Sequence, residues 1–170
     1  PVGIVSLEMP RDEWEYRGLA GAVGIPISEL RAGRLSAETS RSHGSWDEAM
    51  ALLGGWAKAR ALLPVLVSDK PRQRVERVVS TLRRMDRAAR KRWRRGLGFA
   101  VVDYVQLVDA HPERGENRAQ AVADVARHLK DAAKELECPI VACAQLNRGV
   151  ESRDEKRPRM SDLKDSGGIE

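Results

Sequence analysis

Three polar residues that could act on a phosphoryl group each follow a short apolar run of the sequence. They are Glu8, Asp103 and Gln145. Carboxylate oxygens are ligands that Mg²⁺ prefers, and a carboxylate can also orient a water molecule for attack on phosphorus. A single Asp after an apolar run is also typical of an ordinary strand end, so the prediction rests on the combination. If the runs are neighbouring parallel strands, the three side chains face one crevice at the sheet edge.

Four apolar runs of strand length indicate the fold class. They cover residues 2–7, 65–68, 99–102 and 139–144. The runs are nearly continuous rather than alternating, which is typical of strands covered on both faces of a parallel sheet. Segments with helical periodicity separate them, as in α/β folds. We therefore expect an α/β fold with a mostly parallel sheet and helices on both faces.

The helices follow from apolar spacing and capping signals. They are expected over residues 11–23, 45–60, 75–93 and 118–137. In the last two segments the apolar residues recur every three or four positions and form one stripe. Ser45 followed by Glu48 is the pattern of a capping box at a helix start.

Length and composition favour one compact domain. The chain has 170 residues, of which 42% are hydrophobic and 32% charged, enough for a single core. No apolar run is long enough to span a membrane, and no secretory signal precedes the first helix, so we expect a cytoplasmic protein without a membrane partner. Cys138 and Cys143 would lie too far apart on an extended segment for a disulfide, and we expect reduced core residues.

Positive charge is concentrated in one segment. Residues 70–95 contain twelve Lys or Arg against Glu76 and Asp86, a local charge of +10, while the whole chain carries +5. Such asymmetry is expected for a partner that is a polyanion. A run of charge on a helix is more often only its solvated face, and both interpretations remain open at this stage.

Five stretches, in order, resemble the C-terminal motor domain of DnaB-type replicative DNA helicases. They are residues 6–9 (SLEM), 102–107 (VDYVQL), 144–148 (AQLNR), 154–158 (DEKRP) and 161–170 (SDLKDSGGIE). The resemblance covers nearly the whole chain. It implies a RecA-like P-loop NTPase core and a hexameric ring that uses ATP and Mg²⁺ to move along single-stranded DNA and unwind duplex DNA. It further implies a primase and a helicase loader as partners, in the cytoplasm of a bacterial or phage-infected cell and near the nucleoid during replication.

The resemblance assigns roles to the three polar residues. Glu8 matches the catalytic carboxylate that polarises the attacking water. Asp103 matches the Walker B aspartate that orders Mg²⁺, mainly through its water ligands. Gln145 matches the residue that senses the γ-phosphate and relays its presence to the DNA-binding loop.

The resemblance also implies DNA-binding residues near the end of the chain. Lys164, Asp165 and Gly167 fall on the loop that touches single-strand phosphates in the family, and Arg148 is a further DNA-binding candidate. The family usually has Arg and Glu where Lys164 and Asp165 stand. This departure keeps the charges but loses the bidentate fork of an arginine.

The sequence contains no Gly-x-x-x-x-Gly-Lys-[Ser/Thr] pattern, the phosphate-binding loop of P-loop NTPases. We therefore interpret residues 1–170 as a single partial domain, the middle of a motor domain, and expect the isolated chain to be inactive. Two alternatives remain: a RecA-type or circadian-type ATPase, and a non-catalytic DNA-binding or ring-interaction protein with the same fold.

Overall fold

The computed structural model describes residues 1–108, 118–146, 155, 157 and 162. The chain divides into two compact units. The first contains residues 1–9 and 64–170, and the second contains residues 10–63. The prediction of a single partial domain stays a prediction.

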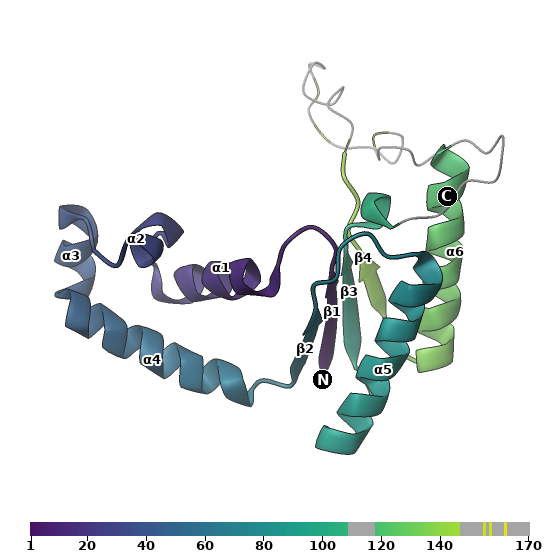
Figure 1. The fold of residues 1–170 in the computed structure, drawn as a ribbon, viewed down its shortest axis with the longest axis horizontal. Helices are drawn as coiled ribbons and strands as arrows, with labels where there is room; N and C mark the ends of the chain where they lie inside the picture. The colour runs from purple at the N-terminus through teal and green to yellow at the C-terminus, as the bar shows by residue number, and fades with distance from the viewer. Residues whose placement is uncertain (109–117, 147–154, 156, 158–161, 163–170) are drawn as a thin grey trace. The chain divides into compact units, whose positions relative to one another are not determined.

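The first unit is built on a parallel sheet. Its strands are β1 (Val2–Ser6), β2 (Val65–Ser68), β3 (Phe99–Asp103) and β4 (Ile140–Ala142), in the order β2-β1-β3-β4 (Figure 1). Every paired neighbour runs in the same direction, so the carboxyl ends of the strands meet at one edge. The predicted α/β fold with a parallel sheet is confirmed.

Two strands are shorter than the apolar runs that predicted them. The run over residues 2–7 extends one residue past β1, and the run over residues 139–144 extends past β4. The physical reason is burial beyond the paired region: Leu7 remains in the core and Ala144 packs against it after their strands have ended. Apolar character reports burial, whereas strand ends depend on backbone pairing.

Helices α5 (Val75–Trp93) and α6 (Arg118–Leu136) cover one face of this sheet (Figure 1). Val5 and Val102, which are paired in register, point toward these helices and are fully buried. The largest fully buried side chains of the two helices are Val78, Leu82 and Val125. Both helices lie within one residue of the predicted ranges, because their apolar stripes match the side that the sheet covers.

The other face of the sheet departs from the expectation of strands covered on both sides. Phe99 and Val141 are 36% and 46% exposed. Side chains alternate between faces along a strand, and the register places both residues on the face away from Val102. At these two positions a continuous apolar run does not mean a covered side chain.

A buried carboxylate anchors the connection from α5 to β3. Asp86 accepts hydrogen bonds from the Leu97 backbone N–H (2.9 Å) and from Arg90 Nε (2.7 Å). The helix ends at Trp93, and the C-cap residue Arg94 has a left-handed φ of 62°. A side chain at Gly96 would meet the Asp86 carboxylate and the Arg90 guanidinium, so a larger residue there would have to displace this ion pair.

The second unit is helical. Its elements are α1 (Arg11–Val23), α2 (Ile27–Ala32), α3 (Ala37–His43) and α4 (Trp46–Leu62). The capping box of Ser45 and Glu48 is confirmed at the start of α4, and the backbone and side-chain hydrogen bonds from Ser45 lower the pKa of Glu48. Helices α2 and α3 were not predicted, because six or seven residues are too few to show a clear apolar period.

Both cysteines are free thiols, as predicted; Cys138 is buried and Cys143 is half-buried. Within the described residues, we find no helix with the length and apolar character needed to cross a membrane.

We predict that Leu82→Ala lowers the free energy of unfolding by about 2–5 kcal/mol, because Leu82 is fully buried and the surrounding core collapses only in part. Urea denaturation measures the change. Leu146→Ala is the matched control in the same unit, since Leu146 is 39% exposed, and it should cost no more than about 1 kcal/mol. Equal losses would show that the core is not centred on α5.

Candidate functional site

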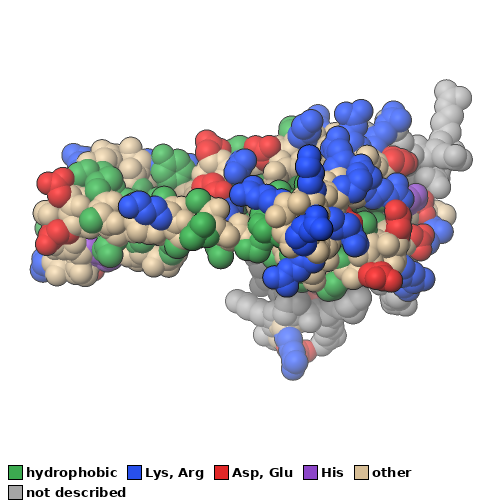
Figure 2. Space-filling view, turned by 90° about the horizontal axis from the view of Figure 1, so that it is seen from below, with side chains coloured by type: hydrophobic (Ala, Val, Ile, Leu, Met, Phe, Trp, Pro, Cys, Tyr) green, Lys and Arg blue, Asp and Glu red, His purple; other side chains and the backbone are tan. Residues whose placement is uncertain are grey.

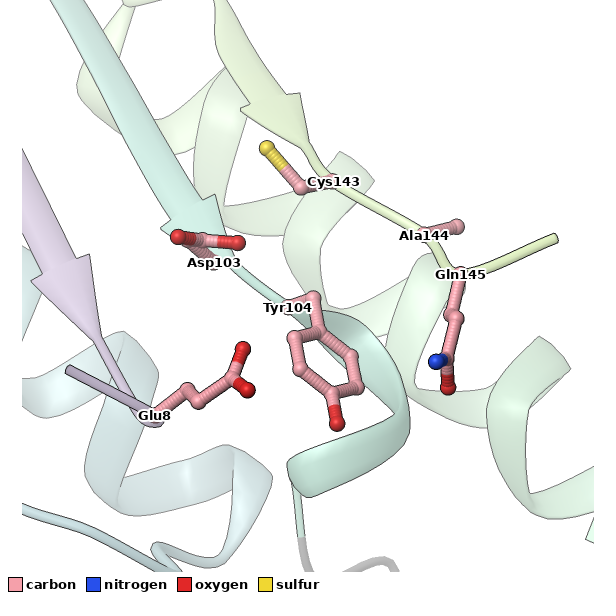
Figure 3. Close-up of a pocket in the computed structure, with 6 residues that line it drawn as sticks. All are labelled: Glu8, Asp103, Tyr104, Cys143, Ala144 and Gln145. Atoms are coloured by element: carbon pink, nitrogen blue, oxygen red, sulfur yellow. The ribbon is translucent and has the colours of Figure 1, made fainter.

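The predicted polar residues line one pocket at the carboxyl edge of the sheet. Its volume is about 210 Å³, and it is lined by Glu8, Asp103, Tyr104, Cys143, Ala144 and Gln145 (Figure 3). Glu8, Asp103 and Gln145 come from three different strand ends that are far apart in the sequence. Their expected juxtaposition is therefore present in the structure.

Glu8 is presented by a turn that a buried serine stabilises. The Ser6 hydroxyl donates to the Met9 carbonyl (2.8 Å) and accepts from the Met9 N–H (3.3 Å). Leu7 is buried in the core, and its N–H donates to the Asp103 carbonyl (2.8 Å). With Leu7 held inward, Glu8 is directed outward and is exposed. The turn thus places a solvated carboxylate beside the end of β3.

Asp103 is the last residue of β3, where it pairs with Ser6 of β1 in register. Its side chain is half-buried, so one side faces the pocket and the other faces protein. The chain then turns through Tyr104 into the short 3₁₀ helix η1 (Val105–Leu107). In Figure 3 the Tyr104 ring stands between the Glu8 carboxylate and the Gln145 amide.

Gln145 is held near Asp103 by a second glutamine. The side-chain amide of Gln106 donates to the Gln145 carbonyl (3.3 Å), and its oxygen accepts from the Gln145 N–H (3.1 Å). The Val105 N–H also donates to the Cys143 carbonyl (2.9 Å). Because Gln106 holds only the backbone of Gln145, the exposed Gln145 side chain keeps its own hydrogen-bonding groups.

Cys143 contributes a neutral group to the pocket. Burial raises the pKa of its thiol, and the negative charge of Asp103 raises this pKa further. The thiol is therefore protonated at neutral pH. The expectation of a core residue is wrong for Cys143, which lies just after β4 and lines the pocket, whereas Cys138 belongs to the core.

The donor set fits a magnesium ion that is held together with a phosphate. Among the described residues no cluster of three or more His, Cys, Asp or Glu side chains could hold a metal alone. Mg²⁺ usually binds through one or two carboxylates, with waters and substrate phosphates as the remaining ligands. Asp103 and Glu8 can supply those carboxylates.

The predicted DNA-binding residues Arg148, Lys164, Asp165 and Gly167 lie outside the described residues. The pocket therefore represents the part of the predicted site that follows β1, β3 and β4.

A family model described as the DnaB-like helicase C terminal domain matches residues 1–170. The chain belongs to the DnaB-like helicase C-terminal domain family. This agrees with the motifs around Glu8, Asp103 and Gln145, which occupy three neighbouring strand ends in the structure.

Curated relatives and solved structures agree with this membership. The replicative DNA helicase DnaB of Geobacillus stearothermophilus is 36% identical over 169 residues, which are 99% of this chain and 34% of the relative. DnaB of Helicobacter pylori strain 26695 is 35% identical, over 99% of this chain and 31% of the relative. The chain thus spans about a third of the length of these relatives.

Two solved structures share the fold. One ATPase domain superposes with a TM-score of 0.80 at 28% identity, covering 99% of this chain and 55% of that domain. A DnaB-like replicative helicase, described with its interactions with primase, superposes with a TM-score of 0.75 at 27% identity, over 99% of this chain and 37% of that one. The predicted RecA-like fold is confirmed.

Sequence reasoning missed the residues that position the site. Ser6 and Gln106 are polar and buried, at 0% and 9% exposure, and both stand inside apolar motifs. A buried polar side chain needs a hydrogen-bonding partner, so a lone Ser or Gln in an apolar run was an available signal. Its partner could not be read from the sequence.

We predict that Gln106→Ala lowers the free energy of unfolding by about 1–3 kcal/mol, because the Gln145 N–H and carbonyl lose their partner. Urea denaturation measures the loss, and hydrogen exchange of the Gln145 amide should become faster. Gln120→Ala, on the exposed side of α6, is the control and should change neither. Unaltered exchange at Gln145 would mean that Gln106 does not hold this segment.

Proposed function

We propose that this chain is the central part of the ATP-driven motor of a replicative DNA helicase, which moves along single-stranded DNA and unwinds duplex DNA. The observation that carries the proposal is the shared pocket of Glu8, Asp103 and Gln145. These residues come from three strands and stand in the motifs of the DnaB-like family. Family membership and the helicase relatives support the same activity.

Each pocket residue has a role that fits its position. Asp103, half-buried at the end of β3, would hold Mg²⁺ mainly through its water ligands. Glu8, exposed on its turn, accepts a hydrogen bond from a water and orients it toward phosphorus. The Gln145 amide can donate to a phosphate oxygen. When bound, ATP with Mg²⁺ supplies the phosphoryl group and the cation that offsets its charge.

The connection from ATP to DNA is proposed to pass through Gln145. Its backbone is fixed by Gln106, while its side chain faces the pocket. A contact between this amide and a terminal phosphate would therefore act on the segment that leads toward Lys164. Arg148, Lys164, Asp165 and Gly167 are the proposed DNA-binding residues on that segment.

The proposed partners follow from the family. They are single-stranded DNA, other copies of this chain in a hexameric ring, a primase and a helicase loader. The description of one solved relative names its interactions with primase. The relatives are bacterial replicative helicases, which supports a cytoplasmic protein of a bacterial or phage-infected cell that acts at the nucleoid.

One observation favours a second candidate function, that of a non-catalytic DNA-binding protein with this fold. The basic residues of α5 are exposed. The two functions differ in whether Glu8 is needed for ATP hydrolysis by the full-length protein.

We predict that Glu8→Gln in the full-length protein slows ATP hydrolysis at least about a hundredfold and leaves ATP binding intact, because the amide keeps the shape but orients water poorly. Steady-state hydrolysis and equilibrium nucleotide binding measure the two effects. Glu76→Gln, an exposed change on α5, is the control and should hydrolyse ATP normally. A rate close to that of the unaltered protein would make Glu8 a structural strand end and favour the non-catalytic function.

We predict that Lys164→Ala weakens single-strand binding, because one cation no longer neutralises a phosphate. The slope of log affinity against log salt should fall by about 0.7 for each phosphate that is no longer neutralised, without a change in sequence preference. Lys164→Arg should bind at least as tightly, because its fork can grip two phosphate oxygens. Lys130→Ala, at an exposed position of α6, is the control and should leave the salt slope unchanged. A slope insensitive to Lys164 would remove this residue from the DNA path.

A further inference from the structure

Helix α5 carries a row of cations on the side opposite its core stripe. Arg77, Arg84, Arg87 and Lys91 are exposed, and their spacing of seven, three and four residues places them along one face of the helix. We call these four residues the α5 ridge. At a rise of about 1.5 Å per residue the ridge is about 21 Å long. The buried residues Val78, Leu82 and Met85 occupy the opposite side and hold the helix against the sheet.

Arg83 and Arg90, beside the ridge, form ion pairs with carboxylates, whereas most residues of the ridge do not. Arg83 forms a two-point ion pair with Glu135 of α6, and Arg90 pairs with Asp86. Arg84 makes a hydrogen bond to the Thr81 hydroxyl (2.8 Å). Arg77, Arg87 and Lys91 have no ion pair with any carboxylate of the described residues. Their charge is therefore available to a partner.

The C-terminal half of this basic surface lies toward the sheet edge opposite the ATP pocket, because α5 runs antiparallel to the strands from Val75 to Trp93. Figure 2 views the molecule from below Figure 1, toward the edge of the sheet opposite the pocket, and Lys and Arg side chains gather there over α5. Arg94 and Arg95 follow the helix at this end and are exposed. Glu76 is the one exposed carboxylate on α5, and it stands in the first turn, far from Lys91. The exposed charged side chains of α5 are thus cations at every position except Glu76.

The chemistry of the ridge indicates phosphate groups as its ligand. Three of its four residues are arginines, whose guanidinium groups can bind two phosphate oxygens at once. Along the helix the cations are about 5–10 Å apart, a spacing that can serve successive phosphates of a nucleic-acid strand.

The α5 ridge has no aromatic side chain on which bases could stack, and this favours duplex DNA over single-stranded DNA as its ligand. Proteins that bind single strands commonly stack the bases on exposed aromatic rings. On α5 the single aromatic residue is Trp93, which is half-buried against the core and lies next to the Arg92 guanidinium (4.9 Å to the ring centre). The ridge therefore offers contacts to a phosphate backbone but no surface for unstacked bases. The bases of a duplex are already stacked on one another, so a protein can bind it through phosphate contacts alone.

We propose that the α5 ridge is a second nucleic-acid-binding surface, which holds the phosphate backbone of duplex DNA independently of sequence. It is separate from the proposed single-strand loop at Lys164 and from the ATP pocket. The proposal does not depend on ATP hydrolysis, so it stands or fails apart from the proposed motor function.

The test is binding of the full-length protein, without nucleotide, to a blunt duplex of 30 base pairs and to a 30-nucleotide oligothymidine over a range of salt. The ridge variant carries Arg77→Gln, Arg87→Gln and Lys91→Gln, which removes three charges without breaking an ion pair among the described residues. The control carries Lys58→Gln, Lys130→Gln and Lys134→Gln, three exposed positions with the same charge loss. Urea denaturation verifies that both variants fold.

We expect the ridge variant to bind duplex at least about tenfold more weakly near 0.1 M salt, with a salt slope reduced by about 0.9 for each phosphate that the ridge no longer neutralises. Its oligothymidine slope and its ATP hydrolysis should match those of the control. A variant with Arg77→Lys and Arg87→Lys should keep most of the duplex slope, since the charge remains. The proposal is overturned by unchanged duplex binding, by an equal loss in the control, or by a loss confined to oligothymidine, which would identify a single strand as the ligand.

Discussion

The site depends on the parallel pairing of β1 with β3. This register sets Ser6 opposite Asp103, and the bond from the Leu7 N–H to the Asp103 carbonyl (2.8 Å) extends it past the end of β1. A shift of one residue would reverse every side chain on β1 and carry the carboxylate of Glu8 away from the pocket. The buried side chains of Val5 and Val102, which face α5 and α6, oppose such a shift. Core packing and site geometry therefore share one constraint.

Buried polar side chains fix the segments that carry the site residues beyond the ends of the strands. Ser6 closes the turn that carries Glu8, and Gln106 holds the backbone of Gln145. Neither side chain needs to touch a substrate, yet each fixes a segment that leaves the sheet. Segments beyond a strand end lack ladder hydrogen bonds, so a buried side chain that supplies such bonds can determine their path.

Helix α5 separates its stabilising and its electrostatic roles by face. Val78 and Leu82 are fully buried against the sheet, while the α5 ridge lies on the opposite side. The positive charges of the α5 ridge repel one another. The neighbouring Arg83–Glu135 and Arg90–Asp86 ion pairs bring negative charge close to the ridge and reduce this repulsion. Asp86 also ties the helix to the start of β3 through the Leu97 N–H.

Residue patterns alone were enough to locate the strands, the long helices and the three polar strand ends, because burial and helical period leave direct traces in residue type. The 19-residue helices α5 and α6 agree with prediction within one residue, whereas the short helices α2 and α3 carried too few residues for a visible period. The order β2-β1-β3-β4, the exposure of Phe99 and Val141, and the partner of Gln106 became known only from the folded chain. These features depend on which distant segments meet, and a hydrogen bond between residues 106 and 145 leaves no local signal at either position.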